Sequence, residues 1–395
     1  MIDAVDTYPY PLNPIYVDFI NLLKDKVKVA RIKMNKRSHF LQKFLLQLLQ
    51  KIRWRESWQG RQAGLTVIEI LVAAIIAVIM VTLLLGFMNQ LLRTNRREQV
   101  MTETQQDMQT ALSFIADDLR SAVHVYDGNC LDGNAPNCSG IFNPNNNFLP
   151  NTPNNAVPIL AFWTLEPLPN ALNANCTGGP NPIGNDIQDS QGNPVNIPCG
   201  SSKTPTLIVY FLRNANPNNI WEGSARIIRY ELPNYNNVGA PVNGYIDPGD
   251  PRTGYRQWPF PPGGTNPISP AAATGNGQAN FEILTDFVDD RLLNNINNRN
   301  NNITCPANYQ ITPSEATLAN YGFGTDDGND ANDMRNFYAC VSTGAVAQGN
   351  INRRSILFLQ GNASGKAGIA SPQDGFLPTL RTEVLSQGVR NRNPR

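Results

Sequence analysis

Histidine is almost missing from this sequence, which has only two in 395 residues. Histidine is the usual general base near neutral pH and a common zinc ligand, so the chain offers little for either kind of site. The motifs H-E-x-x-H and G-x-S-x-G are also missing, and no two cysteines have the spacing C-x-x-C. The segment GNASGKAG (361–368) is one residue short of a phosphate-binding loop, and Ala367 stands where a magnesium-binding hydroxyl is required. We therefore expect that the protein is not an enzyme.

The sequence has no large excess of either charge, since its net charge is +1. The charges are, however, unevenly distributed along the chain. Residues 1–64 carry twelve Lys and Arg against five Asp and Glu, whereas residues 121–395 carry sixteen against twenty. A basic segment before an apolar run and a mildly acidic bulk after it are typical of a membrane anchor with a cytoplasmic N-terminus. The bulk lacks the clustered positive charge of a nucleic-acid binder, so we expect no nucleic-acid partner.

A long apolar run starts at Leu65. Among the 21 residues from there to Leu85, the only polar ones are Thr66, Glu69 and Thr82. A helix of this length can span the roughly 30 Å of membrane hydrocarbon, and the run is too long for the core of a secretory signal peptide. A plain single-pass anchor is the alternative, but it has no use for Glu69, whose carboxylate costs about 2.5–3.5 kcal/mol near the membrane centre. We expect a spanning helix in which Glu69 serves a partner.

The six residues Gly64–Glu69, GLTVIE, resemble the processing motif of type IV pilins and pseudopilins. In that family a prepilin peptidase cuts after the glycine and methylates the new N-terminus. The resemblance implies cleavage between Gly64 and Leu65, N-methylation of Leu65, and removal of a cytoplasmic leader, residues 1–64. It also implies that Glu69 acts in filament assembly, by pairing with the N-terminal amine of a neighbouring subunit. Leu65 departs from the usual phenylalanine, although both are apolar, and a start at Met34 would give a shorter leader.

The apolar pattern predicts that the helix continues past the membrane. Residues 93–126 have an apolar face and contain no glycine or proline, so we expect an amphipathic half that ends near Tyr126. Short apolar stretches between long Asn-, Pro- and Gly-rich loops then predict strands at 157–165, 206–212, 224–232, 281–288, 337–342 and 355–360. Together with the resemblance, this implies an α+β, pilin-like fold. Its long N-terminal helix, with residues 65–92 in the membrane, packs on the antiparallel β-sheet of an exported head, residues 127–395.

All six cysteines follow the apolar run, on the side that is exported: Cys130, Cys138, Cys176, Cys199, Cys305 and Cys340. An even number of cysteines in an oxidising compartment favours disulfides, with free buried thiols as the alternative. Their spacing leaves every pairing open, and pairing of sequence neighbours (130–138, 176–199, 305–340) is the simplest hypothesis.

One acidic segment, TDDGNDAND (325–333), offers many oxygen ligands: Asp326, Asp327, Asp330 and Asp333. Calcium prefers such ligands, but the spacing is not that of an EF-hand, so a calcium site and a solvated acidic loop both remain open. We expect no other cofactor.

A narrower resemblance concerns the helix region 109–123 and the C-terminal segment 376–389, which look like J-type minor pseudopilins of type II secretion systems. With the run at 86–99, the chain is most similar to the pseudopilins of the hormogonium polysaccharide secretion system of filamentous cyanobacteria. This implies a non-enzymatic subunit in the bacterial inner membrane, with a periplasmic head, that supports polysaccharide export and gliding motility. The implied partners are the prepilin peptidase, other pilins or pseudopilins of the filament, and the inner-membrane assembly platform.

The alternative function is a minor type IV pilin that acts as an adhesin or glycan-binding tip. In that case three tryptophans could serve as sugar platforms: Trp163, Trp221 and Trp258. The first two lie in or beside strand-like segments, so we expect them to be core residues instead.

Overall fold

The computed structural model describes residues 66–133, 138, 140–143, 148–169, 203–216, 218–249, 253–261, 264, 266–268, 279–292, 303–325, 332–343, 353–369 and 371–386. The chain divides into two compact units, Met1–Leu84 and Leu85–Arg395. The structural statements below concern the described residues of each unit by itself.

A single long helix, α2 (Val67–Ser121), begins in the first unit and continues into the second. The Thr66 carbonyl accepts hydrogen bonds from the backbone N–H groups of Glu69 (2.9 Å) and Ile70 (3.2 Å), which closes the first turn. The helix ends before the expected Tyr126, because the chain changes to strand β1 (His124–Val125). Histidine and valine are weaker helix formers, and in β1 they pair with strand β2 instead.

The strands form two antiparallel sheets, where the sequence predicted one. The first has the order β1, β2 (Ala156–Pro167), β3 (Lys203–Arg213), β4 (Ala225–Leu232), β5 (Asn280–Val288). The second has the order β6 (Tyr309–Thr312), β7 (Phe337–Ser342), β8 (Arg354–Leu359), β9 (Leu380–Leu385). The long loops contain α3 (Gly128–Asp132), α5 (Glu315–Asn320) and the 3₁₀ helix η5 (Pro372–Gly375). All six predicted strands are confirmed, and β1, β6 and β9 were missed.

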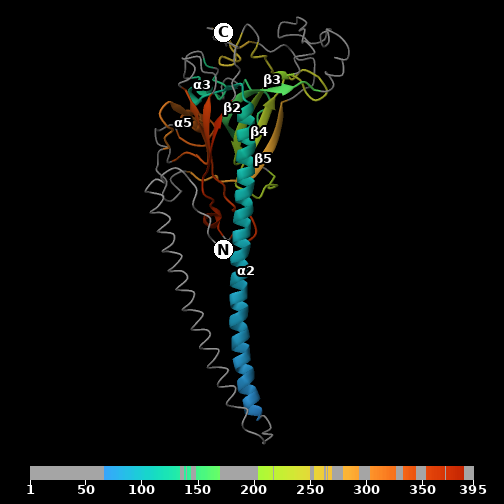
Figure 1. Ribbon diagram of the computed structural model, residues 1–395, viewed down its shortest axis with the longest axis vertical. Coiled ribbons are helices and arrows are strands. Elements are labelled where there is room, and N and C mark those ends of the chain that lie inside the picture. The colour runs from blue at the N-terminus through green and yellow to red at the C-terminus, as the bar shows by residue number, and fades with distance from the viewer. Residues whose placement is uncertain are drawn as a thin grey trace, which may run out of the picture. The chain divides into compact units, whose positions relative to one another are not determined.

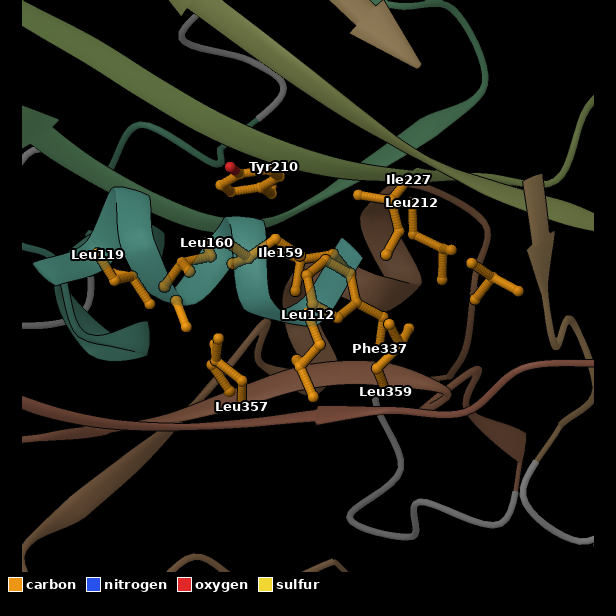
Figure 2. Close-up of a cluster of buried hydrophobic side chains, with 14 of the residues drawn as sticks. Leu112, Leu119, Ile159, Leu160, Tyr210, Leu212, Ile227, Phe337, Leu357 and Leu359 are labelled. Atoms are coloured by element: carbon orange, nitrogen blue, oxygen red, sulfur yellow. The ribbon is translucent and has the colours of Figure 1, made fainter. Parts of the chain in front are cut away.

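The C-terminal half of α2 lies between the two sheets (Figure 1). Figure 2 shows Leu112 and Leu119 of the helix between Tyr210 and Leu212 of the first sheet and Leu357 of the second. The buried residues of α2 recur at helical spacing: Thr104, Met108, Ala111, Leu112, Ile115, Ala116 and Leu119. They cover more of the helix surface than one sheet requires, because the helix packs against both sheets.

The central strands of the first sheet, β2, β3 and β4, are buried on both faces, whereas most of β5 is exposed or half-buried. Successive residues of β2 alternate between the two sides, so that Leu160 and Phe162 face α2 while Ala161 and Trp163 face a second apolar cluster. Residues from the loops around 126–149 and 242–268 complete this second cluster. Double-sided burial accounts for the nearly continuous apolar runs in β2, β3 and β4.

Candidate functional site

The N-terminal part of α2 is apolar and uncovered. One described helix is long and apolar enough to span a membrane, and its most apolar window has no buried residue. Val67 is 85% exposed and Phe87 is 62% exposed, whereas Ile115 near the other end of the same helix is fully buried. An apolar surface of this size is typical of a segment covered by lipid or by partner helices.

Glu69 lies in the first turn of this exposed segment. The other polar side chain between Val67 and Leu85 is Thr82, whose hydroxyl donates to the Ile79 carbonyl of its own helix (2.8 Å). Within the part of the chain that the structure describes, the Glu69 carboxylate makes no hydrogen bond or ion pair. It therefore remains available to a partner. The other two residues of the processing motif, Gly64 and Leu65, lie outside the described residues.

The far half of α2 is fastened to the first sheet by a buried cluster around Arg229, here called the Arg229 cluster (Arg229, Asp118, Tyr210, Glu166 and Glu231). Arg229 Nε donates to Asp118 Oδ2 at 2.7 Å, and the Tyr210 hydroxyl donates to the same oxygen at 2.6 Å. Arg229 also forms ion pairs with Glu231 on its own strand and with Glu166 on β2 (3.8 Å). The Arg229 side chain is only 9% exposed.

One guanidinium thus serves three carboxylates in the Arg229 cluster. Burial raises the pKa of Glu166, against the opposing effect of Arg229, and nearby Asp118 raises it further. Burial also raises the pKa of the Tyr210 phenol, as does the adjoining Asp118 carboxylate. Since Asp118 is on α2 and its partners are on β3 and β4, the cluster fixes how the helix lies on the sheet.

Two of the three expected cysteine pairs are disulfides in the structure, Cys130–Cys138 and Cys305–Cys340. The first closes the loop that begins with α3. The second holds the segment before β6 against the outer face of the second sheet, where Cys340 is buried beside Tyr338 and Ile356. Cys176 and Cys199 lie outside the described residues, so their pairing stays a prediction.

A buried ion pair, Asp127–Arg353, joins the start of α3 to the residue that precedes β8 of the second sheet. Asp127 caps α3 by accepting from the Cys130 N–H (3.0 Å), and its other oxygen accepts from Arg353 Nη1 (2.8 Å). His124 lies three residues before Asp127 and packs edge-on against Tyr126. Burial lowers the pKa of His124 to about 3, and the positive charges of Arg353 and Arg256 add to this effect.

The lowered pKa of His124 predicts that acid weakens the head. Below its ordinary value of 6.5 the histidine takes up a proton when the chain unfolds but stays neutral in the fold. The free energy of unfolding should therefore fall as the pH drops through 6.5, by about 2–3 kcal/mol at about pH 4.5. The measurement is urea unfolding of the purified protein in detergent at both pH values. His124→Gln, which has no proton to gain, should flatten this pH dependence; an unchanged slope in that variant would contradict the assignment.

The acidic segment is only partly described, because Asp326, Asp327 and Asp330 lie outside the described residues. Asp333 is fully buried. One of its oxygens accepts from the Thr325 N–H (3.0 Å), and the other lies 3.2 Å from Arg335 Nη2. Asp333 is thus a structural residue in an internal ion pair. Among the described residues no group of three or more acidic, histidine or cysteine side chains could hold a metal ion.

The GNASGKAG segment packs against α2. Lys366 lies 3.8 Å from Glu103 and 3.5 Å from Asp107, both on the helix. Gly365 has a φ of +99°, and a Cβ atom there would meet the Glu222 carbonyl oxygen. Lys366 therefore contacts α2, and Gly365 allows the close approach of the Glu222 backbone.

Of the two tryptophans that were expected in the core, one is fully buried and the other is not. Trp163 is fully buried, as expected, but so is Trp258, whose indole N–H donates to the Ile246 carbonyl (2.8 Å). The two rings pack edge-to-face at 5.5 Å. Trp221, expected in the core, is half-buried beneath the Arg226 guanidinium. Two of the three proposed sugar platforms are thus inaccessible.

Comparison of the chain with protein-family models, with curated proteins and with solved structures finds no match.

Proposed function

We propose that this chain is a non-enzymatic minor pseudopilin, a subunit of a type II secretion or type IV pilus-like filament in the bacterial inner membrane. The observation that carries the proposal is the division of α2: its first part is apolar and exposed and carries Glu69, whose carboxylate has no polar partner among the described residues, and its second part is built into a two-sheet head. A simple anchor has no need of Glu69. A filament subunit uses such a carboxylate, because its helix must hold a register against its neighbours.

A second feature of α2 supports close contact with a neighbouring helix. Gly86 lies inside the helix, where glycine costs about 1 kcal/mol relative to alanine. A Cβ atom at this position would meet nothing within 4 Å, so the subunit itself does not require glycine there. Small residues in membrane helices commonly allow another helix to approach closely.

The proposed partners are the prepilin peptidase, the other pilins or pseudopilins of the filament, and the inner-membrane assembly platform. The proposed role in polysaccharide export and gliding motility rests on the sequence resemblance. The alternative, a glycan-binding tip, loses support from the burial of Trp163 and Trp258.

The proposal predicts that the mature protein begins at Leu65. Mass spectrometry of the membrane-extracted protein should find an N-terminal methylated leucine and no leader. Gly64→Val should block the cut, because a branched side chain would replace the small residue that the peptidase requires. Gly60→Val is the matched control and should be cut normally. An intact leader in the wild-type protein, or a cut elsewhere, would overturn the pseudopilin proposal.

A further inference from the structure

Three arginines follow the apolar part of α2 directly: Arg93, Arg96 and Arg97. In the proposed topology they lie on the exported side, where the positive-inside rule disfavours basic residues. The chain stays apolar beyond Leu85 as far as Met88 and becomes polar at Asn89, and Arg93 is five residues beyond Met88, or about 7 Å at 1.5 Å per residue. The headgroup layer extends about 5–7 Å beyond the hydrocarbon on each side, so the arginines are level with or just above the lipid phosphates.

Beside these arginines the second unit has a hollow of about 850 Å³. Residues 89–99 of α2 form one side, and Gly368, Ile369 and Asp374 form the other. Gly368 has a φ of +109°, and a Cβ atom there would lie 2.9 Å from Arg96 Cγ. The glycine therefore lets this segment lie against the stem of the arginine.

The three arginines differ in their partners. Arg97 is tied to the head, since its Nη2 donates to the Asp374 carbonyl (3.1 Å) and lies 3.5 Å from the Asp374 carboxylate. Arg93 and Arg96 are exposed and form no ion pair or hydrogen bond through their side chains within the part of the chain that the structure describes. The lining thus has three guanidinium groups against one carboxylate, with apolar Leu92 and Ile369 beside them.

We propose that this hollow binds the phosphate of an anionic phospholipid of the outer leaflet of the membrane, held by Arg93 and Arg96. Guanidinium groups pair well with phosphate oxygens, and the apolar side chains give the first carbons of the lipid a dry surface. A lipid is favoured over a soluble phosphate because the hollow begins where the apolar run ends. The lipid would fix the height of the head above the membrane. The proposal rests on the proposed membrane topology but not on filament assembly.

The test uses the full chain in bilayers of phosphatidylcholine with a minor share of phosphatidylglycerol. After gentle detergent extraction, native mass spectrometry counts the lipids that remain bound. The wild-type protein should retain phosphatidylglycerol in preference to phosphatidylcholine. Arg93→Gln with Arg96→Gln should lower this preference, by about fivefold for each arginine. Arg120→Gln is the matched control, since Arg120 is on the same helix but paired with Asp117 and distant from the hollow; it should bind as the wild type does.

The headgroup site would be overturned if the double variant preferred phosphatidylglycerol as strongly as the wild type does. It would also be overturned if the wild type showed no such preference. Complete displacement of phosphatidylglycerol by inorganic phosphate would show that the hollow binds a soluble anion, and it would overturn the proposal of a lipid site. Protease protection of the head in the same bilayers tests the topology separately. If the wild-type protein inserts correctly but shows no preference for phosphatidylglycerol, the result counts against the hollow alone, whereas failed insertion counts against the proposed membrane function.

Discussion

Replacing Arg229 by methionine is expected to lower the free energy of unfolding of the head by about 3–5 kcal/mol. Methionine fills a similar volume, but it leaves Asp118, Glu166 and Glu231 without the guanidinium that the three carboxylates share. The three carboxylates are partly buried, with side chains 19–33% exposed, so without the counter-charge they keep part of the cost of desolvation and also repel one another. Urea unfolding of the mature protein in detergent, followed by tryptophan fluorescence, measures the loss.

The matched control for Arg229→Met is Arg120→Met on the exposed side of α2. The Arg120 side chain is 56% exposed and pairs with Asp117 in the same helix. Its removal should change stability by less than about 0.5 kcal/mol. Adding Asp118→Asn to Arg229→Met should recover part of the loss, because one unpaired charge is removed. A small effect of Arg229→Met, or no recovery in the double variant, would show that the cluster does not fasten α2 to the first sheet.

Much of the head could be predicted from sequence because its strands are apolar on both faces. β2, β3 and β4 stand out as apolar runs for this reason, and their predicted limits agree closely with the structure. β9 was missed because it is half exposed and mixes Arg381, Thr382 and Glu383 with its apolar residues. β6 was missed because it has only four residues.

The division of the strands into two sheets was not predictable from local pattern. The apolar pattern of a strand does not indicate which other strand it pairs with, and so it does not indicate to which sheet the strand belongs. The buried face of α2 is wider than one sheet needs, and only the structure shows that the second sheet covers the rest. Arg229 was missed as an anchor for a related reason: its carboxylate partner Asp118 is 111 residues away in the chain.

Glu69, the candidate assembly residue, differs from Arg229 in this respect. The sequence alone singled it out, and the structure adds its surroundings. A carboxylate in an apolar run is conspicuous in any sequence. The structure contributes the comparison with Thr82, whose hydroxyl is satisfied within its own helix, while Glu69 has no polar partner among the described residues. This difference makes the two positions a matched pair for an assembly experiment.

The proposed function predicts that Glu69→Ala abolishes filament assembly while leaving the subunit intact. Removal of the carboxylate should ease membrane insertion, and the head should fold normally because its core contains no residue near Glu69 in sequence. The amine of an incoming Leu65 would then be buried without a counter-charge. Breaking such a pair should reduce incorporation of the subunit into the filament by more than about a hundredfold. Thr82→Ala removes a polar group from the same span without removing a charge, and it should assemble normally.

The measurement is gliding motility or polysaccharide export in strains that carry only Glu69→Ala or only Thr82→Ala, with the membrane level of mature protein followed by blot. Glu69→Ala and Arg229→Met should fail in different ways. Glu69→Ala should keep a stable head and lose assembly, whereas Arg229→Met should destabilise the head itself. A plain membrane anchor predicts normal activity and slightly higher protein levels for Glu69→Ala, because insertion is easier and nothing else depends on the carboxylate. Normal activity at a normal level of mature protein would therefore show that Glu69 is not an assembly contact, whereas inactivity at that level, with Thr82→Ala active, would assign the carboxylate to the contact between subunits.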